Sequence, residues 1–325
     1  MVARTVGTFA SGVMRWALLA AFVAAGAFSS WLEPVVVATS PALKEAALAS
    51  ARGGTPLGYA LAAAAAAGWM GLVVLLKPML VFLCLVALEA FATGARPTWR
   101  THRLGFLIRA SFLALTYLAG LVLTRAVGPL PGPLLRLDGT HASWAVKGAE
   151  ASCAFLALTF VVDFFQYWAH RAYHRFGFLW KFHAVHHSPR DLSVLHNFGH
   201  PLEKIVTFFL VTIPATLILG VGGDQFLLIT AFFVIQGDLV HSKATLHFGK
   251  LGSVLVDNRF HFLHHSRRKE DHDVNFAAVY PVLDRLFGTY KAPDGAALRE
   301  TGLDDRLPPR KLTDYYLARL PPTAG

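Results

Sequence analysis

Histidines recur at fixed spacings in three short stretches of this chain, and stretches that act together must meet in the folded protein. The stretches read HRAYH (His170 and His174), HAVHH (His183, His186 and His187) and HFLHH (His261, His264 and His265). Neutral imidazole is the commonest side-chain metal ligand, and no packing requirement explains repeating H-x-x-H-H in an apolar chain. The sequence therefore predicts a metal centre that brings distant segments together.

The number of histidines indicates more than one metal ion. A structural zinc takes four ligands, and a catalytic zinc takes three protein ligands and a water. Eight histidines exceed both requirements and suit two metals side by side. Imidazole suits zinc, copper, iron and nickel, so the ligand type alone does not select the metal.

Helical geometry predicts how the histidine rings divide between two metals. His170 and His174 are four residues apart, so their rings leave one helix on the same side. His183 and His187 have the same spacing, whereas His186 lies about 100° around the helix from His187. Adjacent rings can therefore serve different metals, and the same holds for the third stretch. We expect a ninth ligand, His241, at the end of an apolar segment.

The composition indicates a membrane protein. Of the 325 residues, 54% are hydrophobic and only 15% are charged, against about 25% charged in soluble domains. The net charge of +10 does not indicate nucleic acid, because the basic residues are scattered and several flank apolar segments, where lipid headgroups would lie. Cys84 and Cys153 stand in apolar runs and are not expected to form a disulfide.

Seven segments have the length and apolar character of membrane spans. They are residues 16–31, 57–76, 78–93, 104–124, 150–169, 205–221 and 225–240. The first is interpreted as an uncleaved helix in preference to a signal peptide, and the number of spans before residue 95 stays open. We expect an all-α, multi-pass helical bundle with a histidine-rich cap. Basic residues at 96–103 and 171–190 predict that the cap lies on the cytoplasmic side.

Three further residues are expected near the histidines. Asp163 lies on the same helical stripe as His170, and it either accepts the N–H of a ligand histidine or makes a hydrogen bond for helix packing. Asp238 precedes His241 by three residues. His200, in the segment HPLE, is expected to orient Glu203 or the nearby backbone. His141 is expected to have no role in the site.

These motifs together resemble the fatty acid hydroxylase / sterol desaturase superfamily of integral-membrane di-iron enzymes. The segments LWKFHAVHHS, HPLE, the VHS of His241, FHFLHHS, DVNF and LDRLFGTY occur in family order, over roughly residues 150–292. The resemblance implies a catalytic domain at 104–292, membrane segments without a family match at 1–103, and a polar tail at 293–325. The chain departs from the family pattern at Lys243, where HSK replaces HSN.

The resemblance implies the ligand set and the chemistry. It makes nine histidines ligands of two iron ions: His170, His174, His183, His186, His187, His241, His261, His264 and His265. Asn275, in DVNF, would lie near the metals as an outer or water-mediated partner. The implied activity is hydroxylation of a lipid C–H bond with O2. Electrons would come from a separate ferredoxin or cytochrome with its reductase, because two cysteines cannot hold an iron–sulfur cluster.

Two alternatives stay open on the residues alone. A desaturase begins with the same hydrogen abstraction and would use the same ligand spacing. A zinc-binding membrane protein without redox turnover would also need clustered histidines. The lipid itself is not identified, because a tunnel of apolar side chains would suit a sterol, a fatty acyl chain or another bilayer lipid.

Overall fold

The computed structural model describes residues 79, 81–94, 99–128, 132–136, 144–220, 223–244, 247–295 and 297–323. The expected spans at 16–31 and 57–76 lie outside these residues, as does His141. Contacts divide the chain into two units, Met1–Leu88 and Glu89–Gly325. The described residues of the first unit, 79 and 81–88, are helical.

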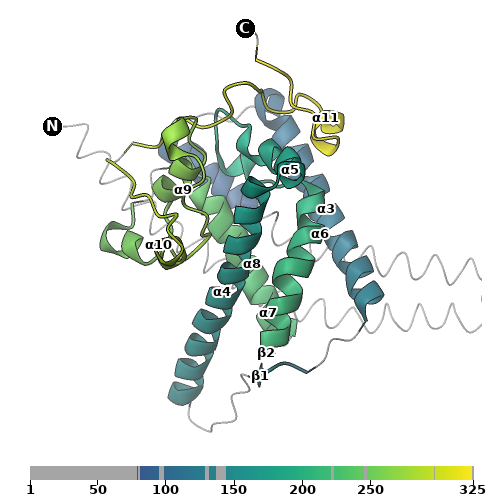
Figure 1. Ribbon diagram of the computed structural model, residues 1–325, viewed down its shortest axis with the longest axis vertical. Helices are drawn as coiled ribbons and strands as arrows, with labels where there is room; N and C mark the ends of the chain where they lie inside the picture. The colour runs from purple at the N-terminus through teal and green to yellow at the C-terminus, as the bar shows by residue number, and fades with distance from the viewer. Residues whose placement is uncertain are drawn as a thin grey trace, which may run out of the picture. The chain divides into compact units, whose positions relative to one another are not determined.

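Long apolar helices form the body of the second unit (Figure 1). They are α3 (Trp99–Val127), α4 (Trp144–Arg175), α8 (Gly223–Val240) and a continuous run of α6 (Pro201–Thr207), the π-helical η2 (Phe208–Thr212) and α7 (Ile213–Ile218). They coincide with the predicted segments 104–124, 150–169, 225–240 and 205–221. By length and composition, Ser152–Arg175 and Pro201–Ile218 could cross a membrane.

The prediction of an all-α fold is confirmed for the described residues. Their sheet structure consists of two-residue strands, β1 (Leu135–Arg136) and β2 (Leu219–Gly220), paired in parallel. The π-helical turn has a local cause, because Pro214 has no N–H to continue the α-helical ladder. Instead, the N–H of Ile213 bonds to the carbonyl of Phe208, five residues earlier.

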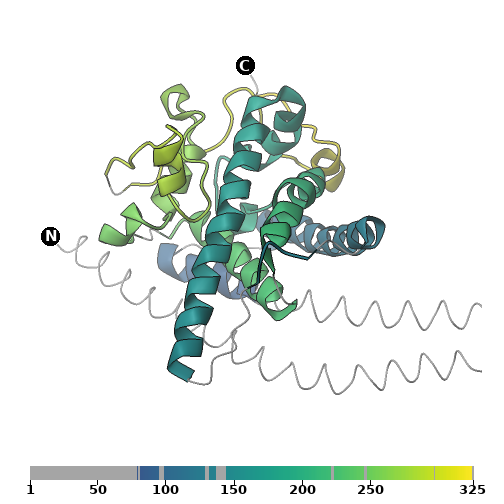
Figure 2. The same ribbon diagram turned by 60° about the horizontal axis from the view of Figure 1, so that its bottom comes forward.

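Short helices and loops gather around the C-terminal end of α4 (Figure 2). They are α5 (Gly177–His187), η1 (Val194–His196), η3 (Gly249–Ser253), α9 (Asn258–His264), η4 (Lys269–Asp271), α10 (Val282–Leu286) and α11 (Leu312–Tyr316). Helix α4 runs unbroken through Arg171 to Arg175. Phe176 is extended, with φ −106° and ψ 116°, and turns the chain into α5. This corner lets α5 pack against α4.

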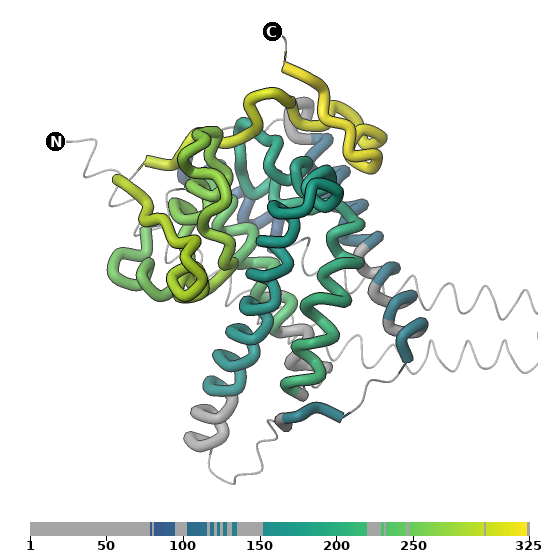
Figure 3. The backbone as a smooth tube through the Cα atoms, in the orientation of Figure 1, coloured from purple at the N-terminus to yellow at the C-terminus, as the bar shows by residue number. Residues whose placement is uncertain are grey.

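Two clusters of buried side chains hold this region together. Tyr167, Phe260 and Phe276 belong to the first, which joins α4, α9 and the following loop. Ile108, Val185, Phe198 and Tyr315 belong to the second, which joins α3, α5 and α11. The C-terminal segment, yellow in Figure 3, therefore packs against the elements that carry the histidines.

Candidate metal centre

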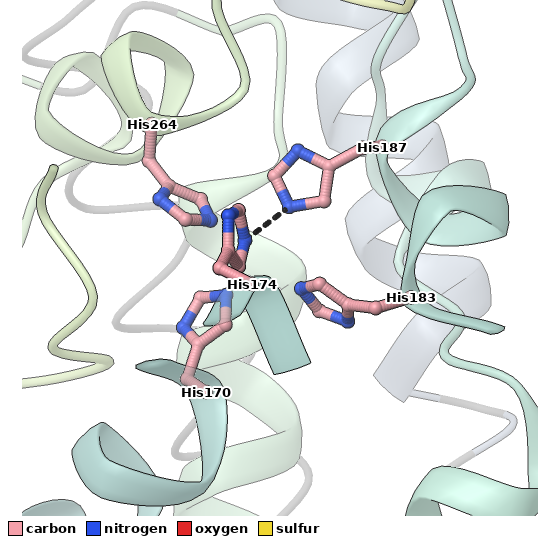
Figure 4. Close-up of side chains that lie close together, drawn as sticks. All are labelled: His170, His174, His183, His187 and His264. Atoms are coloured by element: carbon pink, nitrogen blue, oxygen red, sulfur yellow. Dashed lines mark hydrogen bonds between the residues drawn. The ribbon is translucent and has the colours of Figure 1, made fainter. Parts of the chain in front are cut away.

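The structure brings the nine predicted histidines together in two groups. The five-histidine group, drawn in Figure 4, comprises His170, His174, His183, His187 and His264. The four-histidine group comprises His186, His241, His261 and His265. Within each group, one nitrogen from each ring lies within 4.8 Å of the others. His196, His200, His247 and His272 lie outside both groups.

Neighbouring histidines separate as the helical phase predicts. His186 and His187 are adjacent on α5 but belong to different groups, and so do His264 and His265 at the end of α9. Pairs four residues apart, such as His183 and His187, stay in the same group. One short helix can therefore supply ligands to both groups at once.

Backbone carbonyls fix the tautomer of four of these rings. The Nδ1 atom of His170 lies 2.9 Å from the Phe276 carbonyl oxygen, and that of His186 lies 3.2 Å from the Phe198 carbonyl oxygen. The Nδ1 atom of His241 lies 2.6 Å from the Gly237 carbonyl oxygen, and that of His264 lies 2.7 Å from the Val274 carbonyl oxygen. A carbonyl only accepts hydrogen bonds, so each Nδ1 carries the hydrogen. The Nε2 lone pair of each ring is then available to a metal.

Carboxylates hold two more rings in the same way. Nδ1 of His174 lies 3.1 Å from Asp273 Oδ1, and Nδ1 of His183 lies 3.2 Å from Glu203 Oε2. A carboxylate that accepts the Nδ1 hydrogen also makes the ring a more basic ligand. Both rings belong to the five-histidine group.

The spacing of the Nε2 atoms fits a bound metal. Nε2 of His186 and Nε2 of His241 are 3.2 Å apart, although both rings carry their hydrogen on Nδ1. Two lone pairs that face each other repel unless a cation lies between them. Two nitrogen ligands about 2.1 Å from a metal and at right angles would be about 3.0 Å apart. The residues present therefore fit a metal in the four-histidine group.

The residues of the five-histidine group also fit a bound metal. Nε2 of His170, His183 and His264 is buried and has no hydrogen-bond partner among the described atoms. A buried polar atom without a partner is costly. A metal ion would satisfy all three nitrogens.

Burial keeps these imidazoles neutral, which is the form that binds metal. It lowers the pKa of His183, His186, His187, His261, His264 and His265 well below the ordinary value. It also lowers the pKa of His241 to about 3. At neutral pH little free energy is therefore spent on removing protons before a metal binds.

Asp163 supports a loop beside the site. Its carboxylate accepts the backbone N–H groups of Ala278, Val279 and Tyr280 at 2.9, 3.1 and 2.7 Å. Of its two predicted roles, the structure therefore shows a packing hydrogen bond and not a contact to a histidine ring. The held loop begins two residues after Phe276, whose carbonyl orients His170.

Asp238 makes a buried ion pair instead of contacting His241. Its Oδ2 lies 2.9 Å from Arg109 Nη2, and its Oδ1 accepts the side-chain amide of Asn197 at 2.6 Å. Arg109 also donates to the Asn197 carbonyl. The sequence analysis missed Arg109, although a cation inside a predicted apolar span was a usable signal.

This trio, Arg109–Asp238–Asn197, lies next to two of the orienting carbonyls. Gly237, which orients His241, precedes Asp238, and Phe198, which orients His186, follows Asn197. The trio joins α3, α8 and the loop after η1. It therefore fixes two backbone segments that hold the four-histidine group.

His200 and Glu203 act together at the start of α6. The His200 N–H donates to Glu203 Oε1 at 2.9 Å, and the other carboxylate oxygen contacts His183. The His200 ring accepts from the Leu202 N–H and donates from Nε2 to the Tyr316 carbonyl. The expectation that His200 orients Glu203 agrees with these contacts. Glu203 itself was missed as a direct partner of a histidine ring.

Asn275 has a backbone role. Its φ is +59°, a conformation in which asparagine is one of the more frequent residues. Its amide donates to the Phe260 and Lys291 carbonyls, and its Oδ1 accepts the Lys291 N–H. The residues on either side, Val274 and Phe276, present their carbonyls to His264 and His170. Asn275 thus shapes the turn that orients two rings.

The fold and these two groups define a helical protein with paired histidine clusters suited to metal. Residues 155–289 match the sequence model of the fatty acid hydroxylase family, which confirms the family resemblance for that segment. The segment contains all nine histidines.

Curated relatives share this part of the chain. An ornithine lipid hydroxylase of Rhizobium tropici is 31% identical over 162 residues, which are 49% of this chain and 47% of the relative. The human alkylglycerol monooxygenase is 28% identical over 40% of this chain and 29% of its own length. A very-long-chain aldehyde decarbonylase of Oryza sativa is 27% identical over 45% of this chain and 24% of its own length. The chain thus covers less than half of each of these relatives. No solved structure matches.

Proposed function

We propose that this chain is a membrane-bound, O2-dependent di-iron oxygenase that hydroxylates a C–H bond of a lipid. The nine histidines of the two groups would be the iron ligands, five for one ion and four for the other. The observation that carries the proposal is the His186–His241 contact, where two tautomer-fixed lone pairs face each other. Support also comes from the relatives, whose names describe a lipid hydroxylase and a lipid monooxygenase.

Iron supplies the chemistry that protein side chains lack, namely activation of O2 for attack on an unactivated C–H bond. The chain contributes nine neutral rings, and the Nδ1 atoms of six of them are held by carbonyls and carboxylates. These contacts would hold the Nε2 atoms of those six rings in place to ligate iron. Burial of the rings would exclude bulk water from the bound iron.

Substrate and electrons come from outside the chain in this proposal. Helices α3, α4, α6–α7 and α8 would cross the bilayer, and the site would lie at the cytoplasmic end of α4, within reach of a lipid. The sequence contains two cysteines, which cannot hold an iron–sulfur cluster. We infer that a ferredoxin or cytochrome with its reductase delivers the electrons.

The first experiment measures metal content and product together. Detergent-purified protein from iron-replete cells is analysed for metals, and lipid extracts of cells with and without the gene are compared by mass. We expect about two irons per chain and a lipid that has gained one oxygen atom. A product lacking two hydrogens would reassign the reaction to desaturation. One tight zinc without iron would contradict the proposal.

A further inference from the structure

Large apolar side chains lie exposed on two short helices of the second unit. Their exposed fractions are 63% for Leu251 and 55% for Val254, in and just after η3, and 39% for Val282 and 67% for Leu286, in α10. We refer to these four side chains as the apolar patch. The two helices are joined, because Arg285 in α10 donates to the Ser253 carbonyl at 2.6 Å. Adjacent exposed apolar side chains of this kind mark an interaction surface.

The patch adjoins the end of the apolar part of α4. The Phe287 ring, which follows α10, lies 4.9 Å from the Trp168 ring and 5.3 Å from the Tyr167 ring, between ring centroids. Arg171 donates to the Phe287 carbonyl. Figure 1 shows α10 beside α4. The patch therefore stands where α4 changes from apolar to basic, which is where a spanning helix meets the headgroups.

The exposed charged side chains on and beside the two helices are all positive. Lys250 and Arg285 are exposed, whereas Asp257 and Asp284 are buried. No exposed acidic side chain occurs within residues 247–257 or 281–290. Exposed leucine and valine with cations alone suit an interface with lipid phosphates.

We propose that the apolar patch rests on the headgroup region of the bilayer that α4 crosses, with Lys250 and Arg285 facing lipid phosphates. The inference rests on the membrane insertion given under the proposed function. Docking of this kind would hold η3, α10 and the loop after DVNF at a fixed depth. This loop begins directly after Phe276, whose carbonyl orients His170.

Fluorescence quenching by spin-labelled lipids tests the proposal on the full chain. Single cysteines are introduced at Leu251 and Leu286 in a Cys84→Ala/Cys153→Ala background and labelled with a fluorophore. Leu317, 51% exposed just after α11, is the matched control. The metal-loaded protein is reconstituted into vesicles of phosphatidylcholine, with or without an equal part of phosphatidylglycerol, that contain headgroup-labelled nitroxide lipid.

We expect quenching at positions 251 and 286 to be at least about twofold stronger than at position 317. Adding Lys250→Glu should reduce quenching in the phosphatidylglycerol vesicles and leave it unchanged in phosphatidylcholine alone. Equal, weak quenching at all three positions would overturn the docking.

A fourth label separates this failure from failure of the proposed function. Leu156, 57% exposed in the apolar part of α4, is labelled and tested against nitroxide placed deep in the acyl chain. Quenching there without quenching at the patch would reject only the docking. No quenching at Leu156 would reject the membrane insertion on which both proposals depend.

Discussion

At the scale of single residues, the site depends on which ring nitrogen carries the hydrogen. His241 illustrates this, because its Nδ1 is held by Gly237 and its Nε2 faces both His186 and His261 at 3.2 and 3.1 Å. A neutral ring cannot donate from both nitrogens. The three converging Nε2 atoms are therefore arranged for a cation and not for hydrogen bonds with one another.

Removing one ring from each group should separate the two metals. We expect His186→Ala to lose about one metal per chain from the four-histidine group, and His264→Ala to lose about one from the five-histidine group. Both variants should lose activity and still insert into the membrane. Metal analysis and membrane fractionation check this, with His141→Ala as the control. Full activity in either ligand variant would disprove the di-metal assignment.

Glu203 should control metal affinity without being a ligand. A methyl group on Gly199 would lie 2.9 Å from Glu203 Oε2, so Gly199→Ala should push the carboxylate away from His183. We expect Gly199→Ala and Glu203→Gln each to weaken metal binding about 10- to 100-fold. Competition with a chelator measures the affinity. Gly177→Ala, which meets open space, is the control, and equal affinity in all four proteins would contradict the role.

At the scale of elements, a buried ion pair fixes α3 to α8. Replacing Arg109 by leucine would leave Asp238 buried without its cation, which costs about 3 to 5 kcal/mol. We expect Arg109→Leu to lower the unfolding temperature and to release metal from the four-histidine group first. The double variant Arg109→Leu/Asp238→Leu should recover much of the thermal stability. Thermal unfolding in detergent tests this, and equal stability of the single and double variants would contradict it.

The sequence predicted the helical elements well where periodicity and chemistry coincide. The i, i+4 spacing of His183 and His187, and the divergence of His186, follow from helix geometry alone. The contact partners of Asp163 and Asp238 could not be predicted, because they come from residues 278–280 and from Arg109, far away in sequence. Spacing identifies which side chains share a helix face but not which distant backbone they meet.

At the scale of the whole molecule, the segment after the last histidine holds the site from outside. Tyr315 donates to the Gly199 carbonyl, and the Tyr316 carbonyl accepts from His200. Thr301 donates to the Pro189 carbonyl. The region after residue 293, expected as a polar tail, is thus anchored to two loops. One carries HPLE, and the other follows HAVHH.

Asp271 makes this anchoring dependent on pH. Burial raises the pKa of its carboxyl group, but hydrogen bonds from Lys291 and Ser266 and the charge of Arg299 outweigh burial and leave it below the ordinary value. A carboxyl whose pKa is depressed by folding contributes stability above its unfolded pKa, about 3.9. That contribution is lost as the pH falls through the lower, folded value.

We therefore expect Asp271→Asn to be less stable than the parent at neutral pH, by about 1 to 3 kcal/mol. The difference should shrink as the pH falls below about 4, because protonation then removes the same interactions from the parent. Thermal unfolding of metal-free protein across this range isolates the effect from the acid release of metal. Glu300→Gln, at an exposed side chain, is the control. A stability difference that stays constant with pH would show that Asp271 acts through its shape and not through its charge.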